Sequence, residues 1–163
     1  MAICRQLLIT QATATFDFDE GGRLLSKTDA DLVDISYTYD LLNQVRTATD
    51  MLNRVTTYAY DGNGNLYTIT DPRNIITEYS YTDRDLVETV TKAGVRIAYY
   101  GYDESGRWTT VTNARERIWE NSFDQAGNLI SSTTPLGLTD HFYEYYPDGN
   151  LQRRVDRNNR ETN

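Results

Sequence analysis

The sequence is poor in the residues that most often carry covalent or metal chemistry. Its 163 residues include one cysteine, Cys4, one histidine, His141, and three prolines. A single cysteine excludes an internal disulfide framework. A Ser/His/Asp triad or a metal site would have to centre on His141, and no second ligand cluster stands out, so His141 is expected to be a strand residue. A nucleophilic Cys4 would need a base and an oxyanion site, and neither is suggested.

Basic residues and long apolar runs are also scarce. The chain has 16 Lys and Arg against 24 Asp and Glu, a net charge of -8. Binding to nucleic acid or to an anionic membrane surface needs a basic face, so neither partner is expected. No apolar run approaches the length of a membrane-spanning helix. The first residues lack the long apolar core of a secretory signal, so no signal peptide is predicted.

Tyrosine, in contrast, is abundant, and it recurs in a repeat of 21 residues. A Tyr or Phe, followed by Asp in most rows, recurs at Phe18-Asp19, Tyr39-Asp40, Tyr60-Asp61, Tyr81-Thr82, Tyr102-Asp103, Phe123-Asp124 and, one residue late, Tyr145-Tyr146. Self-similarity at a fixed period of this size signals a repeat architecture. Most residues are therefore placed by the repeat and not by a catalytic site.

A turn follows each of these aromatic pairs. One column of the turn holds only Gly, Asn and Asp, at Gly22, Asn43, Gly64, Asp85, Gly106, Gly127 and Gly149. These residue types tolerate positive φ, so the column is predicted to be a left-handed turn position. The aspartates that precede the turns are interpreted as caps of their own turns and not as acid–base groups.

The turn that begins at Asp61 also resembles the start of a calcium-binding loop. That loop needs Gly at its sixth position and Glu at its twelfth, where this chain has Leu66 and Pro72. A hairpin turn is therefore the preferred interpretation. No cofactor and no metal are expected.

Alternating columns on both sides of the turn predict a β-hairpin in each row. Leu24 and Val45 open a column that is followed, at spacings of two, by two columns of Ser and Thr, and all three are expected on one strand face. A second turn, opened mostly by Asp or Asn, leads to a return strand. That strand carries Tyr37, Tyr39, Tyr58, Tyr60, Tyr79, Tyr81, Tyr100 and Tyr102 in successive rows.

Seven such rows give about fourteen strands, in an array over residues 15–163 that follows an irregular segment at residues 1–14. A sheet of so many strands must twist and curl. The predicted fold class is all-β, with repeated antiparallel hairpins in one strongly curved sheet, a segment of a β-shell.

The rows resemble the YD-repeat or RHS-repeat family. The residues that carry the resemblance are Tyr60-Asp61-Gly62-Asn63-Gly64-Asn65-Leu66 with Thr70-Asp71-Pro72-Arg73-Asn74, and Phe123-Asp124-Gln125-Ala126-Gly127-Asn128-Leu129. The family includes bacterial Rhs polymorphic toxins, shell components of Tc toxin complexes, wall-associated proteins and teneurins. The resemblance implies a β-sheet ribbon that spirals into a hollow shell, which in the toxins encloses a C-terminal toxic domain.

In those toxins a core segment at the end of the shell performs self-cleavage. This chain has no Asp-Pro-x-Gly core motif, because Asp71-Pro72 is followed by Arg73-Asn74, and no toxin domain is expected within its residues. The chain is therefore expected to be a non-catalytic stretch of shell wall from a larger secreted or cell-surface bacterial protein. Its expected partners are the rest of that shell and the cargo domain. Self-association through edge strands is also expected.

The tyrosines leave two interpretations open. They can pack one face of the sheet with their hydroxyls at a wet interface, or they can form a strip that binds carbohydrate, polypeptide or cargo. An adhesive module that binds carbohydrate or protein is accordingly the alternative function. Trp108 and Trp119, in the fifth row, are expected to pack locally, with a binding platform as the alternative. An enzyme would need a polar cluster that breaks the repeat, and the sequence shows none.

Overall fold

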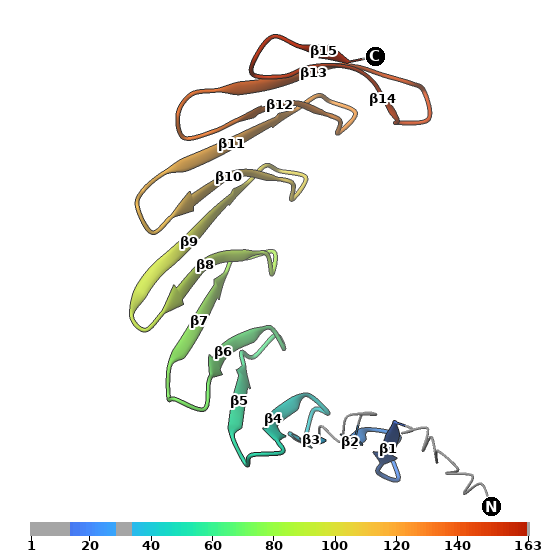
Figure 1. Cartoon of the computed structure of the whole chain (residues 1–163), viewed down its shortest axis with the longest axis vertical. Helices are drawn as coiled ribbons and strands as arrows, with labels where there is room; N and C mark the ends of the chain where they lie inside the picture. The colour runs from blue at the N-terminus through green and yellow to red at the C-terminus, as the bar shows by residue number, and fades with distance from the viewer. Residues whose placement is uncertain (1–13, 29–33, 163) are drawn as a thin grey trace, which may run out of the picture. The chain divides into compact units, whose positions relative to one another are not determined.

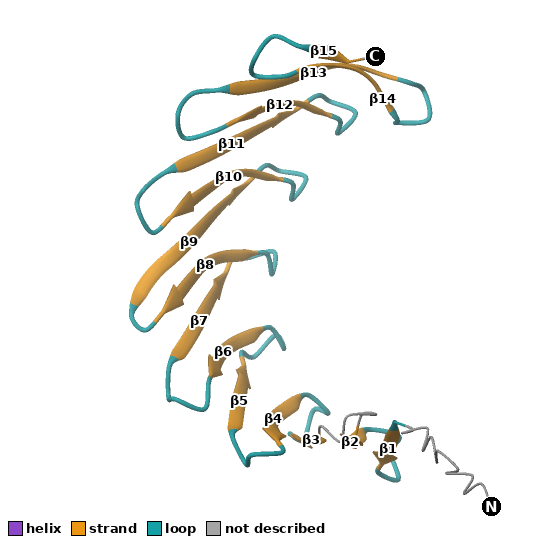
Figure 2. Ribbon diagram, viewed as in Figure 1, coloured by secondary structure: helices purple, strands orange, loops and turns teal. Residues whose placement is uncertain are grey.

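The computed structural model describes residues 14–28 and 34–162, and these residues form strands and turns without a helix (Figures 1 and 2). The strands are β1 (Thr15–Phe18), β2 (Leu24–Thr28), β3 (Asp34–Tyr39), β4 (Val45–Asp50), β5 (Val55–Tyr60), β6 (Leu66–Thr70), β7 (Ile76–Tyr81), β8 (Val87–Lys92), β9 (Val95–Tyr102), β10 (Trp108–Asn113), β11 (Ile118–Phe123), β12 (Leu129–Thr133), β13 (Thr139–Tyr145), β14 (Leu151–Val155) and β15 (Glu161–Thr162). The segment 1–13, with Cys4, lies outside the described residues.

The chain divides into two compact units, one ending at Ile75 and the other beginning at Ile76. In the first unit β1 to β6 pair antiparallel, each strand with its neighbour in the chain. In the second unit β7 to β15 pair in the same way. The predicted all-β fold of antiparallel hairpins is therefore confirmed, and β15 adds a short strand after the seven hairpins.

A β-bulge interrupts the pairing beside the first turn of a row. Tyr39 lies opposite Val45, but Thr38 lies opposite Thr47, so Arg46 is an extra residue in β4. Residues directly opposite each other share a face, which places Val45 with Tyr39 and Thr47 on the other face. The prediction that the Leu24 and Val45 column shares a face with the Ser and Thr columns is therefore wrong. The bulge shifts by one residue the alternation of side chains between the two faces of the sheet. The same shift occurs in five further hairpins.

The bulge sorts each unit into two chemically different faces. The face that we call the tyrosine face carries the eight predicted tyrosines and, opposite them, the column that includes Val45. The other face, the hydroxyl face, carries the Ser and Thr columns. Its cross-strand pairs bond to each other, with Oγ1 of Thr38 2.6 Å from Oγ1 of Thr47 and Oγ of Ser80 2.7 Å from Oγ1 of Thr89. Hydroxyl pairs of this kind stabilise a sheet modestly.

Neither unit has a hydrophobic core. Within each unit a strand contacts only the strands that precede and follow it in the chain, so each unit is a single layer. Among the described residues no apolar side chain is buried, and the only buried residue is Asp140, which is 5% exposed. A single layer of this kind is stabilised by its backbone ladder, its turns and the half-buried tyrosines. It also leaves both faces accessible.

Glu116 occupies a strained position in the second turn of the fifth row. Its φ is 55°, in the left-handed region, where Asn53 and Asn74 stand in the equivalent turns. Its carboxylate bonds to Arg96 at 2.9 Å, but this pair is exposed and contributes little. We expect Glu116→Asn to raise the free energy of unfolding by about 0.5–1 kcal/mol.

Chemical denaturation monitored in the second unit measures this effect. Glu104→Asn, an exposed turn position outside the positive-φ set, is the matched control and should leave the midpoint unchanged. A lower midpoint for Glu116→Asn would contradict the strain argument.

Candidate functional site: the tyrosine face

The eight predicted tyrosines all lie on the tyrosine face of their units and all are half-buried. Tyr37, Tyr39, Tyr58 and Tyr60 belong to the first unit, and Tyr79, Tyr81, Tyr100 and Tyr102 to the second. None of the eight side chains is fully buried and none is fully exposed. A role for this strip in contacting ligand or cargo stays a prediction.

The second tyrosine of a row is fixed by its hydroxyl. Tyr39 donates to the carbonyl of Leu24 at 2.7 Å, Tyr60 to that of Val45 at 3.0 Å and Tyr102 to that of Val87 at 2.7 Å. Burial raises the pKa of the Tyr60 and Tyr102 hydroxyls, so both stay protonated donors at neutral pH. Each such bond ties one row to the preceding row, and it uses the one hydrogen that the hydroxyl can donate.

The turn residues hold the rows in register. All seven predicted turn positions have positive φ, from 58° at Asp85 to 95° at Gly127. In the turn that contains Gly64, Oδ1 of Asp61 accepts from the backbone N–H groups of Asn63 and Asn65, each at 2.9 Å. The aspartates thus cap their turns, as interpreted from the sequence, and the Asp61 turn closes a hairpin.

The second turn of a row is built by the same device, which the sequence pattern showed less clearly. Asp50 accepts from the N–H groups of Leu52 and Arg54 at 2.9 and 3.0 Å. Asn53 has a φ of 59° and Asn74 a φ of 61°. The Arg54 side chain, and then its N–H, lower the pKa of Asp50, so the cap is ionised at neutral pH. The mixed residue types of this column concealed its positive φ.

Arginines connect the turns of successive rows. The guanidinium of Arg23 lies 5.1 Å from the ring centre of Tyr39 and donates to Asn43 at 2.8 Å. Arg107 lies 4.8 Å from the ring centre of Phe123. Such cation–π contacts cover the half-buried rings at the first-turn side of the sheet. At these two rings an arginine therefore covers part of the tyrosine face.

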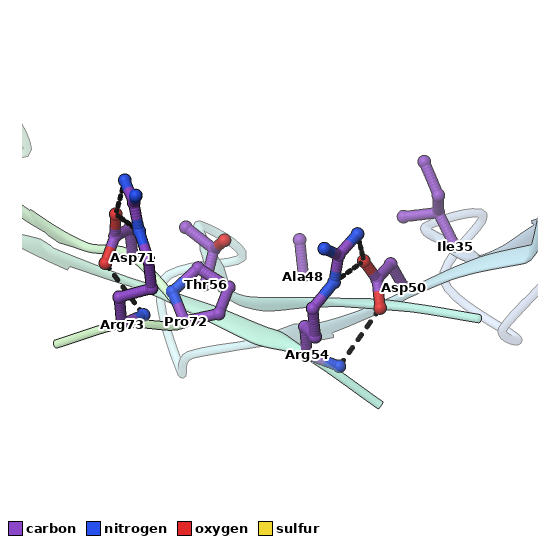
Figure 3. Close-up of a pocket in the computed structure, with 8 residues that line it drawn as sticks. All are labelled: Ile35, Ala48, Asp50, Arg54, Thr56, Asp71, Pro72 and Arg73. Carbon is purple, nitrogen blue, oxygen red and sulfur yellow. Dashed lines mark hydrogen bonds and ion pairs between the residues drawn. The ribbon is translucent and has the colours of Figure 1, made fainter. Parts of the chain in front are cut away.

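The second-turn side of the same face is hollow in the first unit (Figure 3). Ile35, Ala48 and Thr56 form the floor of a cavity of about 430 Å³, which we call the hollow. Its rim consists of two ion pairs, Asp50 with Arg54 at 2.6 Å and Asp71 with Arg73 at 3.1 Å, together with Pro72. Figure 3 shows both guanidiniums on the side of the sheet to which Ala48 and Ile35 point.

An ion cluster that sequence reasoning missed lies in the second unit. Asp140 is a charged residue in a column that otherwise holds Ile35, Thr56, Thr77, Ala98 and Trp119. Its carboxylate accepts from the N–H and from the guanidinium of Arg157, both at 2.7 Å. Arg154 approaches the same carboxylate at 3.5 Å and stacks 5.3 Å from the ring centre of Phe142. In the sequence, the one-residue delay of the last row was the only sign that this region departs from the repeat. It did not identify Arg154 and Arg157 as the partners of Asp140.

The Asp140 cluster makes stability depend on pH. The Arg157 guanidinium, chiefly, holds the pKa of Asp140 at about 2, below its ordinary 3.8. Because the folded pKa is the lower one, the stabilisation is complete above about pH 4 and is lost as the pH falls towards 2. We expect the denaturation midpoint to fall across that window, and to fall less in Asp140→Asn. An equal fall in both proteins would assign the effect to the turn aspartates alone.

The remaining candidates behave as ordinary strand residues. His141 lies in β13 opposite Ser131. Trp108 lies opposite Tyr102 and is 44% exposed, and Trp119 lies opposite Val111 and is 37% exposed. Across residues 14–28 and 34–162, no group of three His, Cys, Asp or Glu side chains is placed to hold a metal ion. The same residues include no helix of the length and apolarity that crossing a membrane requires.

Comparison with known proteins agrees with this geometry. The family model of the RHS Repeat matches residues 39–75, a segment that contains Tyr39-Asp40, Tyr60-Asp61 and the turns that follow them. This segment is therefore similar to the RHS repeat. No curated protein sequence matches the chain. Rows with positive-φ turns and bulges of the same kind continue on both sides of the matched segment.

Solved structures share the fold of this chain. A TcdB2-TccC3-Cdc42 structure matches with a TM-score of 0.72 and 19% identity over 87% of this chain. A Photorhabdus luminescens Tc holotoxin pore matches with a TM-score of 0.73 and 19% identity over 87% of this chain. TcdB2-TccC3 without its hypervariable C-terminal region matches with a TM-score of 0.73 and 20% identity over 86%. The chain spans 9% of the length of each.

Proposed function

We propose that this chain is a stretch of RHS shell wall that encloses a toxin or other cargo domain and performs no catalysis itself. The observation that carries the proposal is the single layer of capped hairpins, in which the described residues bury no apolar side chain. Such a layer encloses nothing alone, but rows added in the same register extend it as a continuous wall. The RHS match and the fold of the Tc toxin structures support this reading.

The mechanism is exclusion. Backbone pairing between rows leaves no gap in the wall, the tyrosine hydroxyls and turn arginines hold each row to the next, and the capped turns fix the register. The parent protein is proposed to be secreted or delivered to the cell surface by a bacterium, with the rest of the shell and its cargo as partners. The alternative is an adhesive module that binds carbohydrate or protein, but the hydroxyls of Tyr39, Tyr60 and Tyr102 already donate to backbone carbonyls and so have no hydrogen to donate to a sugar.

The intact mass of the native polypeptide, followed by limited proteolysis, tests the proposal. We expect a polypeptide much longer than 163 residues, with a segment that resists protease until the wall is opened by denaturant. A native product of about 163 residues would contradict encapsulation, because it could not enclose a domain. A long polypeptide in which every segment outside the rows is digested at once would contradict it as well.

The chain studied alone is expected to self-associate. Edge strands of an open sheet present unpaired backbone groups that pair with another chain. The net charge of -8 opposes this association, so it should strengthen with salt. Light scattering over a concentration series measures it, and a monomeric mass that does not change with concentration or salt would contradict the expectation.

A further inference from the structure

The two ends of the hairpins in the second unit carry opposite charge. We call these ends the first-turn side, residues 82–86, 103–107, 124–128 and 146–150, and the second-turn side, residues 92–94, 113–117, 134–138 and 156–160. Because each strand pairs antiparallel with its neighbour, all first turns lie at one end of the strands and all second turns at the other. The first-turn side holds six Asp and Glu against two Arg, a net charge of -4, and the second-turn side holds five Lys and Arg against two Asp and Glu, a net charge of +3.

In the fourth and fifth rows, charges on both sides have no partner within the described residues. Asp83 and Glu104 lie in the first turns of these rows, and Lys92 and Arg115 lie in the second turns. All four side chains are exposed, and none of them forms an ion pair with another described residue. Arg84, also in a first turn, bonds to backbone carbonyls and not to a carboxylate. The charges of these two rows are therefore available to a partner outside the chain.

The second row, in the first unit, matches its two turns in a different way. Leu41 and Leu42 lie in its first turn and are 101% and 73% exposed, and Met51 and Leu52 lie in its second turn and are 56% and 63% exposed. Adjacent exposed apolar side chains are a mark of contact surfaces. The two turns of one row are thus both apolar in the second row, and oppositely charged in the fourth and fifth rows. This correspondence within single rows is more specific than a difference in net charge.

The two sides also repeat with the same pitch, because each row contributes one turn to each side. Two antiparallel strands in a row give a pitch of about 10 Å. A second copy displaced along the strand direction therefore brings each of its first turns against the second turn of the same row. We propose that two copies of this stretch of rows stack in this way, with the second-turn side of one copy on the first-turn side of the other.

In this arrangement each unit stacks on the same unit of the other copy. Lys92 meets Asp83 of the other copy, and Arg115 meets Glu104 in the next row. In the second row Leu41 and its neighbour pack against the apolar tip of the second turn. The contact is heterologous, so each copy keeps one free side and the stacking can be repeated. It goes beyond the shell function, because added rows extend a wall in one direction only, whereas stacking extends it in the other.

Zero-length cross-linking of the full chain tests the proposal. A carbodiimide joins a lysine amine to a carboxylate, and Lys27 and Lys92 are the two lysines of the chain. Within one copy, the six residues of β8, about 20 Å, separate Lys92 from Asp83, which is further than the two side chains reach. In an equal mixture of isotope-labelled and unlabelled chains, we expect a link from Lys92 to Asp83 that joins a labelled chain to an unlabelled one. Its yield should fall about fivefold or more in about 1 M salt, whereas association through edge strands strengthens with salt.

Charge-reversal variants at the neighbouring row leave this reporter pair unchanged. Arg115→Glu places a carboxylate against Glu104 of the other copy, so the yield should fall about fivefold or more. Glu104→Lys alone should lower it similarly, because it faces Arg115. A mixture of labelled Arg115→Glu and unlabelled Glu104→Lys restores an opposite pair, and the link from labelled Lys92 to unlabelled Asp83 should return. Arg46→Glu makes the same change of charge at an exposed position of β4, outside both sets of turns, and should leave the yield unchanged.

An unchanged denaturation midpoint establishes that each variant is folded, since all the substituted positions are exposed. No link between copies from Lys92 to Asp83, the same yield in Arg115→Glu, or no recovery in the complementary mixture would each overturn the inference. These readouts are separate from the proteolysis of the native polypeptide. A protected cargo without this link would overturn the stacking alone, and the link with an exposed cargo would overturn the shell function alone.

Discussion

Asp140→Ala should lower the stability of the last rows by about 3 kcal/mol. Asp140 is 5% exposed and accepts from Arg157 twice, while Arg154 lies 3.5 Å away. Removing the carboxylate leaves two cationic side chains without their common partner. The expected loss of stability is at the lower end for a buried ion pair, because the Arg154 and Arg157 side chains are 42% and 39% exposed and can be hydrated.

Hydrogen exchange of the β13 and β14 amides measures this loss where it arises. Stability in a repeat array is a sum of row and neighbour contributions, so the last rows open while others stay closed. Asp83→Ala, an exposed turn aspartate of the second unit, is the control and should leave exchange unchanged. If Asp140→Ala exchanges like the unmodified chain, the cluster contributes nothing net to folding.

Gly64→Val should destabilise the first unit by about 2 kcal/mol. Gly64 has a φ of 90°, where a β-branched residue clashes with its own backbone, and a Cβ there would lie 3.1 Å from Nε2 of Gln44. Gln44 donates to the carbonyl of Gly64 at 3.0 Å, so the substitution also disturbs the bond between successive turns. Both effects act at the turn that sets the register of β5 and β6.

Gly62 provides a matched control two residues away in the same turn. It is not in the positive-φ set, and a Cβ at this position would meet nothing within 4 Å. Gly62→Val should therefore be nearly neutral, while Gly64→Asn should be mild, because Asn43 occupies the equivalent position with a φ of 64°. Equal denaturation midpoints for Gly62→Val and Gly64→Val would show that conformation at Gly64 is not what the turn requires.

The hairpins could be predicted from residues such as Tyr60, Asp61 and Gly64 because each acts locally. An aspartate caps the turn that follows it, and a glycine with positive φ reverses the chain within a few residues. The face assignment failed for Val45 because the bulge at Arg46 depends on how two strands align, which an alternation counted along one strand does not contain. The hollow and the Asp140 cluster were missed for a related reason, since each depends on which side chains lie opposite one another.

The sequence by itself determined the period, the turns, the all-β class and the RHS resemblance, because these follow from short-range chemistry repeated every 21 residues. Only the tertiary structure decided which columns share a face, where the tyrosine hydroxyls donate, and that Ala48 leaves a cavity while Asp140 gathers two arginines. The physical reason is that pairing brings together residues from different strands, and a bulge of one residue changes every side-chain contact beyond it.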